Sequence, residues 1–444
     1  MSFEPSISAA GSLPLLQRRP FRMLSYTRFF SRVAQNATGF ALVLLIVDET
    51  GKAIFSSLLV LALVVPSTVA GIVAGTAADI LPKRLLVSLG DLARAAICIY
   101  FLRNGGGVAS YYIVAILIAT ATQFATSAEG AILPAIVDRT ELAKAHAISQ
   151  AVGGAAQLIG LGILTPVVLR VFDSSRSLFG ICAVLFLLAG LQVWWIGKTK
   201  TPLRREVGGE MTGRWWLTGW RAMRADALVL NACIELTLIS AVIIILGGII
   251  PTYISDVLDL PVDIGALILT PAAIGVVLGL KFASFLAHRI PHALLSTVGF
   301  FWFVVVLALL AFVNKEADFL GGFGAFSWLN SVSIGSFDGG GVIAMVLMLP
   351  LGFSYATVTV ASNTVIDDRV PLHLRGRVGA TQSALSAIAS SIPVLAAGGL
   401  TDLIGVAPVI AMVAGVTGAF AIVNLRQPRE DRLSRRGVAV QDLH

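Results

Sequence analysis

Five charged side chains interrupt otherwise apolar stretches of the sequence: Arg32, Arg94, Glu129, Glu235 and Lys281. A charge at the centre of a membrane helix costs about 2.5–3.5 kcal/mol on insertion scales, so each should be paired or serve a function. Glu129 lies at a similar depth to Arg32 and Arg94, and we predict that it pairs with one of these arginines.

Two of these groups, Glu235 and Glu129, are candidates for binding protons, because a carboxyl group removed from water takes up a proton more readily. A structural ion pair is the alternative for Glu129. For Glu235 the alternative is a polar contact with Lys281 or with a neighbouring helix, since the long side chain of Lys281 could also extend to the cytoplasmic surface of the membrane.

Uncharged polar side chains recur along the same stretches. Arg28, Arg32, Gln35 or Asn36, and Gly39 follow one another at helical spacing, which predicts a polar stripe facing protein or water. Amides beside aromatic rings are typical of a cavity that holds an amphipathic molecule. The residues predicted to line a substrate cavity are Gln35, Asn36, Phe40, Gln123, Asn231, Tyr355 and Gln382.

Membrane-spanning helices are the elements that must position these residues. The 444 residues are 57% hydrophobic and only 13% charged, and the mean hydropathy is +0.88, whereas soluble domains average about 25% charged residues. The apolar residues form blocks of roughly 20, the length that spans a hydrocarbon core. We count six blocks in each half and predict an all-α integral membrane protein with twelve transmembrane helices in two pseudo-symmetric six-helix bundles.

The predicted organisation has five parts. A linker containing an amphipathic helix rich in Trp and Arg separates the two bundles. The parts are an N-terminal tail (1–21), an N-terminal bundle (22–197), the linker (198–225), a C-terminal bundle (226–425) and a basic C-terminal tail (426–444).

The positions of the basic residues predict the orientation. Of the 32 Lys and Arg residues, about 23 fall in the termini and even-numbered loops and about 5 in the odd-numbered loops. The positive-inside rule then places both termini and the linker in the cytoplasm of a multi-pass protein of the cell (inner or plasma) membrane. The net charge of +7 is thus explained by membrane topology and lipid contact, and nucleic acid is not an expected partner.

Short sequence repeats favour an internal duplication. Residues 78–86, after the second block, resemble residues 287–295, after the eighth. Residues 137–142 resemble residues 367–372 before the fifth and eleventh blocks, and the longer connection at 314–339 explains why this pair is further apart. Duplicated halves are typical of secondary transporters.

The segment from Gly75 through Asp79 to Lys83 and Arg84 resembles the loop signature between spans two and three of the major facilitator superfamily, with Pro82 as a departure. Residues 90–95, which include Asp91 and Arg94, and residues 131–142 are similar to bacterial drug, macrolide and siderophore exporters of that superfamily. The similarity extends from about residue 22 to residue 425.

This resemblance implies the fold, alternating access and a gate at the cytoplasmic side. Asp79 should face the positive N-terminal end of span eleven, near Arg375 and Arg377. An Arg common in span four is missing, and Gly153, Gly154, Gly160 and Gly162 before Pro166 are what remains of a Gly-rich antiporter signature. The gating residues implied are Gly75, Asp79, Lys83, Arg84, Asp91, Arg94, Arg375 and Arg377.

Enzyme chemistry has little support in the sequence. Residues 352–356 nearly match a hydrolase nucleophile elbow, but they lie within an apolar helix and end in Ala356 instead of Gly. No phosphate-binding loop and no His-Glu-x-x-His zinc motif is present, so we expect neither an enzyme nor a cofactor or metal.

We therefore expect a monomeric secondary active transporter that exports a small, amphipathic compound in exchange for protons. Two alternatives remain at this point. One is another mode of the same fold, either uptake or lysophospholipid flipping. The other is a membrane sensor or scaffold that does not transport, because a fold does not establish an activity.

Overall fold

The computed structural model describes residues 15–137, 141–172, 175–196, 215–258, 260, 266–286, 290–313 and 339–426. A few side chains within these ranges are not described, among them those of Gly75 and Asp79. The two predicted tails, most of the 198–225 linker and the long connection after residue 313 lie mainly outside these ranges.

The first half of the chain forms six helical passes. The fifth pass is composite, because a π-helical segment, η4, separates two α-helices. The elements are η2 (Leu15–Gln17), α1 (Arg19–Thr50), α2 (Ala53–Ile80), α3 (Lys83–Asn104), α4 (Val108–Ile136), α5 (Leu142–Gln157), η4 (Leu158–Leu164), α6 (Thr165–Phe172), α7 (Ser175–Gln192) and η5 (Val193–Ile196).

The second half begins with the short helix α8, which corresponds to the amphipathic helix predicted in the linker. In the described part of the second half, six further α-helices and the short 3-10 helix η6 follow it. The elements are α8 (Trp215–Arg224), α9 (Ala227–Asp256), η6 (Ala266–Leu269), α11 (Thr270–Leu286), α12 (His292–Ala311), α14 (Gly339–Arg369), α15 (Leu372–Ile404) and α16 (Val406–Arg426).

Among the described residues, eleven helical segments are long and apolar enough to cross a membrane. The predicted eighth span, at 262–286, corresponds to α11, which has 17 residues and follows the short η6. Large apolar side chains such as Val73, Ile113, Ile392 and Val416 remain exposed on the outer faces of the helices. A soluble protein rarely leaves so many exposed, whereas lipid covers them in a membrane.

Proline and glycine mark the helix ends. Pro82 and Pro291, which correspond in the predicted repeat, both stand immediately before a helix, α3 and α12 respectively. Proline is favoured at a helix start because the missing N–H would have no intrahelical acceptor there. Gly51 ends α1 in the left-handed region at φ 64°, where its N–H bonds the Val47 carbonyl, so a side chain at this position would be strained.

The π-helical segment η4 has a local cause. Pro166 has no N–H, so the carbonyl of Gly162 loses its usual partner four residues on. The N–H of Thr165 reaches back five residues to the Gly160 carbonyl. The Thr165 hydroxyl donates to the same oxygen at 2.8 Å. The fifth pass therefore changes its winding midway through the membrane.

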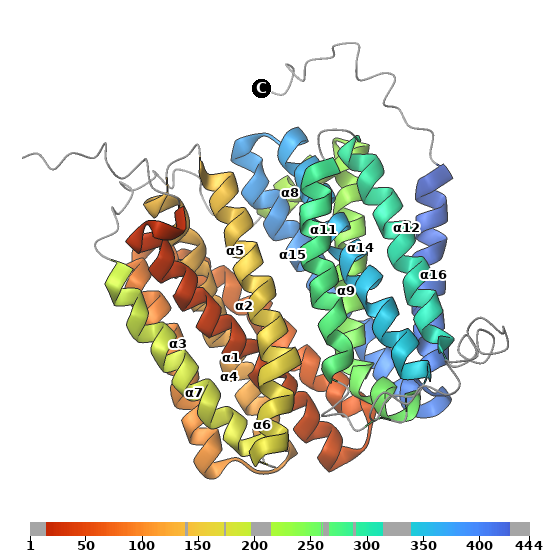
Figure 1. Ribbon diagram of the computed structural model, residues 1–444. Coiled ribbons are helices and arrows are strands. Elements are labelled where there is room, and N and C mark those ends of the chain that lie inside the picture. The colour runs from red at the N-terminus through yellow and green to blue at the C-terminus, as the bar shows by residue number, and fades with distance from the viewer. Residues whose placement is uncertain are drawn as a thin grey trace, which may run out of the picture.

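The helices form two groups (Figure 1). Helices α1–α7 enclose one set of apolar cores, which includes Phe101, Phe179 and Phe186. Helices α9–α16 enclose another, which includes Phe300 and Phe303. We call these the N-terminal and C-terminal groups. We call the membrane face at which α1 begins and α16 ends the terminal face, at the upper end of Figure 1.

Glycines allow α11 and α14 to pack backbone against backbone within the C-terminal group. A Cβ on Gly275 would collide with the Leu349 carbonyl, and one on Gly352 would collide with the Ala272 carbonyl. Gly275 and Gly279 are four residues apart, the spacing of small residues that lets membrane helices approach closely.

The two groups are joined at the face opposite the termini. The Asp402 carboxylate at the end of α15 accepts hydrogen bonds from the backbone N–H groups of Ala53, at 2.8 Å, and Ile54, at 3.1 Å. The Ser56 hydroxyl donates to the Gly248 carbonyl at 2.7 Å. An acid of the C-terminal group therefore caps the N-terminus of α2, where it also meets the positive end of the helix dipole.

Candidate functional site

A cavity of about 560 Å³ lies between the N-terminal and C-terminal groups. Its walls come from α1, α2, α4, α5 and η4 on one side and from α9, η6, α11, α12, α14 and α16 on the other. Its size is typical of sites that hold a drug-sized molecule. Any motion of one group relative to the other must therefore change the shape of the cavity.

Five of the seven predicted cavity residues line this space: Gln35, Asn36, Phe40, Gln123 and Tyr355. The three amides come from α1 and α4 of the N-terminal group, whereas Tyr355 lies on α14 of the C-terminal group. The stripe predicted along α1 therefore faces the interior, as the helical spacing indicated.

The other two predicted cavity residues, Asn231 and Gln382, lie outside the cavity lining. The part of α9 that lines the cavity begins at Ile243, more than three turns beyond Asn231. The Gln382 amide donates to the Ser386 hydroxyl on its own helix at 2.9 Å. Both side chains lie nearer the terminal face than the part of the C-terminal group that encloses the cavity.

Additional lining residues were not among the predicted cavity set. They include Ser67, Thr122, Gln157, Tyr253 and Thr270. Single hydroxyls within apolar helices usually bond their own backbone, so their types alone do not distinguish them from packing residues. The described lining contains no Asp, Glu, Lys, Arg or His, and its polarity comes from amides, hydroxyls and phenols.

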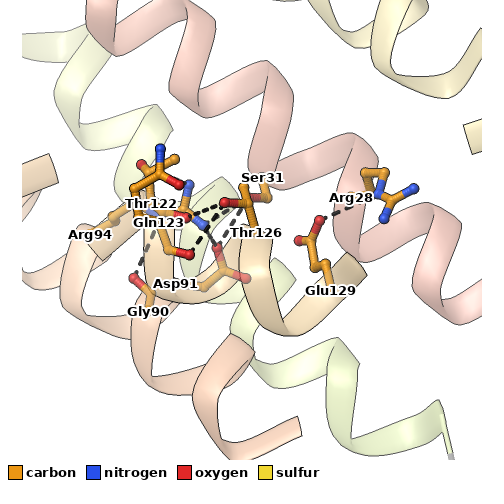
Figure 2. Close-up of polar contacts among 9 residues, drawn as sticks. All are labelled: Arg28, Ser31, Gly90, Asp91, Arg94, Thr122, Gln123, Thr126 and Glu129. Atoms are coloured by element: carbon orange, nitrogen blue, oxygen red, sulfur yellow. Dashed lines mark hydrogen bonds and ion pairs between the residues drawn. The ribbon is translucent and has the colours of Figure 1, made fainter. Parts of the chain in front are cut away.

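Asp91 and Arg94 form an ion pair on α3 in which both side chains are fully buried. Figure 2 shows this pair between α1 and α4. The Asp91 oxygen that binds Arg94 also accepts a hydrogen bond from the Ser31 hydroxyl at 3.1 Å. Arg94 in turn donates to the same hydroxyl at 2.9 Å. The second carboxylate oxygen, Oδ2, is buried and accepts no hydrogen bond from the described residues.

Arg94 has contacts beyond its carboxylate partner. Its guanidinium lies 4.6 Å from the centre of the Phe186 ring on α7, a cation–π distance. Its Nε donates to the Gly90 carbonyl at 3.4 Å and its Nη1 to the Thr122 hydroxyl at 3.5 Å. Because Thr122 also lines the cavity, Arg94 connects the ion pair to the cavity wall.

The predicted partner of Glu129 is wrong. Glu129 pairs with Arg28, with 3.3 Å between Oε2 and Nε, while Arg94 pairs with Asp91. Arg28 and Arg32 share one face of α1 a turn apart, so helical spacing alone does not distinguish them. Figure 2 shows the Arg28–Glu129 pair beside the Asp91–Arg94 cluster, and the two pairs together bind α1, α3 and α4.

Glu235 is buried on α9 of the C-terminal group. It accepts hydrogen bonds from the hydroxyls of Ser296 and Thr297 on α12, and Ser296 contacts the Ser362 hydroxyl on α14 at 2.6 Å. Lys281 is exposed on α11. The hydrogen bonds recorded for Glu235 therefore come from hydroxyls of a neighbouring helix, which was one of the two predicted alternatives, and the other, a contact with Lys281, is not among them.

The sequence model of the Major Facilitator Superfamily matches residues 24–393, most of the chain. The chain belongs to the Major Facilitator Superfamily. It is therefore a multi-pass membrane protein of a transporter family. Its resemblance at the loop between α2 and α3 is thereby confirmed at the level of the family.

Individual members of the Major Facilitator Superfamily are similar over nearly the whole chain. The multidrug efflux pump Tap of Mycobacterium tuberculosis, like that of Mycobacterium bovis, is 23% identical over 404 residues, covering 87% of this chain and 88% of Tap. A solved variant of the nucleoside transporter NupG superposes with a TM-score of 0.72 at 12% identity, covering 91% of this chain and 99% of NupG. The peptide transporter POT in complex with sulfate gives 0.68 at 13% identity, covering 94% and 96%. At these identities the two structures establish the fold alone.

Six of the eight predicted gate residues belong to helix ends at the terminal face, whereas Asp91 and Arg94 lie deeper, where Arg94 reaches the cavity wall. Lys83 and Arg84 begin α3, while the side chains of Gly75 and Asp79, near the end of α2, lie outside the described part. Arg375 donates to the Val370 carbonyl at 3.0 Å and lies 3.9 Å from Asp367. Arg377 is exposed. The predicted contact of Asp79 with α15 stays a prediction.

Ion pairs at the terminal face join elements of the same helical group. Arg18 contacts Glu141 at 2.6 Å within the N-terminal group, and Arg369 contacts Asp226 at 2.9 Å within the C-terminal group. The recorded polar contacts between the groups lie at the opposite face, where Asp402 caps α2. Polar contacts thus tie the groups together at the opposite face.

Proposed function

We propose that this protein is a secondary active exporter that moves small amphipathic compounds across the plasma membrane in exchange for protons. The observation that carries the proposal is the cavity, because both helical groups contribute its walls. Rocking of the two groups about this space would expose it to one face of the membrane at a time. The similarity to the multidrug efflux pump Tap favours export.

The cavity wall suggests the chemistry of the exported compound. Amides and hydroxyls offer hydrogen bonds, aliphatic and aromatic side chains offer apolar contact, and the described lining offers no charge. An ionic substrate would lose its hydration there without gaining a counter-charge. The preferred substrate is therefore an uncharged amphiphile, with cations and anions as weaker substrates.

The orientation follows from the distribution of basic residues. With both termini in the cytoplasm, the face closed by Asp402 and the start of α2 is the outer face. The conformation described above is then closed to the outside. Export requires the opposite closure, in which contacts at the terminal face replace those of Asp402.

Glu235 is the proposed proton-binding group of the C-terminal group. Thr297 has one hydroxyl proton but two acceptors within reach, the Ala293 carbonyl at 3.0 Å and Glu235 Oε1 at 3.1 Å. A protonated Glu235 would donate to Thr297, which would then donate to Ala293, so the neutral carboxyl is accommodated without losing a hydrogen bond. Glu129, beside a guanidinium, is better suited to holding α1 against α4.

The proposal is tested in an efflux-deficient bacterial host and in everted membrane vesicles. The probes are N-phenylnaphthylamine, a neutral aromatic amphiphile, and ethidium, an aromatic cation. An imposed proton gradient should drive the neutral probe into the vesicles, and an uncoupler should abolish its accumulation. Accumulation in right-side-out vesicles instead would indicate uptake, and movement of a fluorescent lysophospholipid alone would indicate flipping.

Three substitutions sharpen the test. Gln123→Leu removes an amide from the cavity wall and should change the selectivity between the two probes. Gln192→Leu makes the same chemical change on α7, where the amide contacts Met23, and should not. Glu235→Gln should reduce gradient-driven accumulation far more than exchange of probe for probe. Wild-type vesicles that move none of the probes or lipids would refute transport.

A further inference from the structure

The Asp91–Arg94 pair has an asymmetry that a purely structural ion pair does not need. One Asp91 oxygen binds both Arg94 and the Ser31 hydroxyl, while the other is buried and takes no hydrogen bond from described residues. A buried carboxylate oxygen without a donor loses its hydration without compensation. Adding a proton to that oxygen removes the charge that needs the compensation.

We infer that Asp91 is a second proton-binding carboxylate, in the N-terminal group, and that Arg94 transmits its charge state to the cavity through Thr122. The inference rests on the proposed exchange of substrate for protons and adds the residue that links the two. In the superfamily signature this pair was predicted to belong to the gate, whereas its contact with Thr122 places it against the cavity wall.

The groups around Asp91 act on it in opposite directions. Burial, the largest influence, and the Glu129 carboxylate on α4 oppose the charged form, whereas the Arg94 guanidinium on α3 and the Ser31 hydroxyl on α1 favour it. The α7 wall is uncharged, with the Phe186 ring over Arg94 and the Gly190 backbone against Asp91. The charged and titratable groups that act on the pair are Glu129 on α4, Arg32 on α1 and the buried thiol of Cys98 on α3. Behind them lie Arg28, which acts on Arg32, and the buried thiol of Cys182 on α7, which acts on Cys98.

Arg94 keeps most of its contacts when Asp91 becomes neutral. The Phe186 ring, the Gly90 carbonyl and the hydroxyls of Ser31 and Thr122 all remain available to its guanidinium. Protonation of Asp91 therefore does not leave the arginine as an isolated buried charge, which would be prohibitively costly.

The proton step itself is simple. A hydronium ion gives its proton to a lone pair of Asp91 Oδ2 and becomes water, no bond between heavy atoms breaks, and the charge of the pair rises from zero to +1. The guanidinium keeps its hydrogen bonds but no longer has a counter-charge, and it lies 3.5 Å from the Thr122 hydroxyl, against a cavity whose described lining is uncharged. A cation beside an apolar site weakens the binding of an amphiphile. Proton and substrate therefore exclude each other, as antiport requires.

The first experiment needs no substrate. Purified wild-type protein and Asp91→Asn protein are titrated with acid in weakly buffered detergent solution, and the protons bound per molecule are compared. Wild type should bind one proton more than the variant over the range in which transport operates. Glu141→Gln, which removes a carboxyl from an ion pair at the terminal face, controls for the loss of a partly exposed acid.

The second experiment tests the link to the cavity with N-phenylnaphthylamine in everted vesicles. Asp91→Asn should reduce the ratio of gradient-driven accumulation to probe-for-probe exchange by about tenfold or more. Thr122→Val keeps the shape of the side chain but removes the hydroxyl that Arg94 reaches. It should titrate like wild type, yet the probe should no longer displace protons from it.

Each outcome bears on the inference. If Asp91→Asn does not fold, the double variant Asp91→Asn with Arg94→Gln is used, because it leaves no buried charge without a partner. Failure of both variants to fold would show that the pair is structural and would overturn the inference. Equal proton binding by wild type and variant, or unchanged coupling in folded variants, would overturn it as well. Absence of probe transport by wild type would refute the exporter proposal separately, and the titration would still decide the role of Asp91.

Discussion

The contact of Asp402 with the start of α2 leads to a quantitative prediction about conformational balance. Asp402→Ala removes two hydrogen bonds, of 2.8 and 3.1 Å, that cross between the two helical groups. Replacing a helix N-cap acid by Ala costs about 1 kcal/mol, within a range of about 0.5–2. Because Asp402 is partly exposed, solvent screening keeps the effect from exceeding this value. These hydrogen bonds exist only in the conformation in which the opposite face is closed. Their loss therefore destabilises that conformation relative to the one in which this face is open.

A loss of about 1 kcal/mol lowers the ratio of closed to open molecules at this face about fivefold. The assay is the distance distribution between spin labels at Leu58→Cys and Leu403→Cys, two exposed positions on α2 and α15. The native cysteines are buried and are left in place. Asp402→Ala should increase the population at long distance.

The control is Asp256→Ala at the end of α9. Asp256 is also an exposed acid on the same face, but its recorded hydrogen bond comes from the neighbouring Ser255. This variant should leave the distance distribution unchanged. If Asp402→Ala also leaves it unchanged, or if both variants shift it equally, the capping contact does not hold the face closed.

Further predictions concern stability. Glu129→Gln should lower the free energy of unfolding by about 3 kcal/mol, the lower end for a buried pair, because Arg28 is partly exposed. Glu141→Gln, in a more exposed pair, should lower the free energy of unfolding by less than about 1 kcal/mol. Equal losses of stability in the two variants would contradict this prediction. Gly352→Ala should cost about 1–3 kcal/mol through overpacking against Ala272. Gly153→Ala, where a Cβ meets open space, is its control. Thermal unfolding in detergent measures all four, and a Gly352 variant as stable as its control would contradict the packing argument.

The helical passes could be predicted from the sequence because the thickness of the hydrocarbon core sets the number of apolar residues that a membrane-spanning helix needs. The expected blocks coincide closely with the observed helices, and Pro82 and Pro291 mark equivalent starts in the two halves. The eighth pass was predicted less accurately, because the short η6 and the 17-residue α11 stand where one long helix was expected. The short loop signature also sufficed to indicate the superfamily, which the family match confirms.

The polar site was only partly predictable. Helical spacing placed Gln35, Asn36 and Gln123 correctly on interior faces. It could not choose between Arg28 and Arg32 as the partner of Glu129, because that depends on how far α1 is shifted along its axis relative to α4. The pair of Asp91 and Arg94 has the spacing of helical neighbours and was within reach of sequence reasoning.

Contacts between the halves were beyond sequence reasoning. Asp402 lies almost 350 positions from the residues whose N–H groups it binds, and nothing in its local sequence distinguishes it from an ordinary loop acid. The same holds for Asn231, whose exclusion from the cavity depends on where the two groups close.

The π-helical turn before Pro166 has a mechanical consequence. A π-helix holds more residues per turn than an α-helix, so the two halves of the fifth pass are offset in rotation about their common axis. Reverting η4 (Leu158–Leu164) to α-helical winding would turn α6 relative to α5 by up to about 100°, the angle of one residue. This rotation would carry Gly162 away from Thr270 of the C-terminal group, against which it packs. A rotation within this one pass would thus break the contact between Gly162 and Thr270 without moving the two helical groups away from each other.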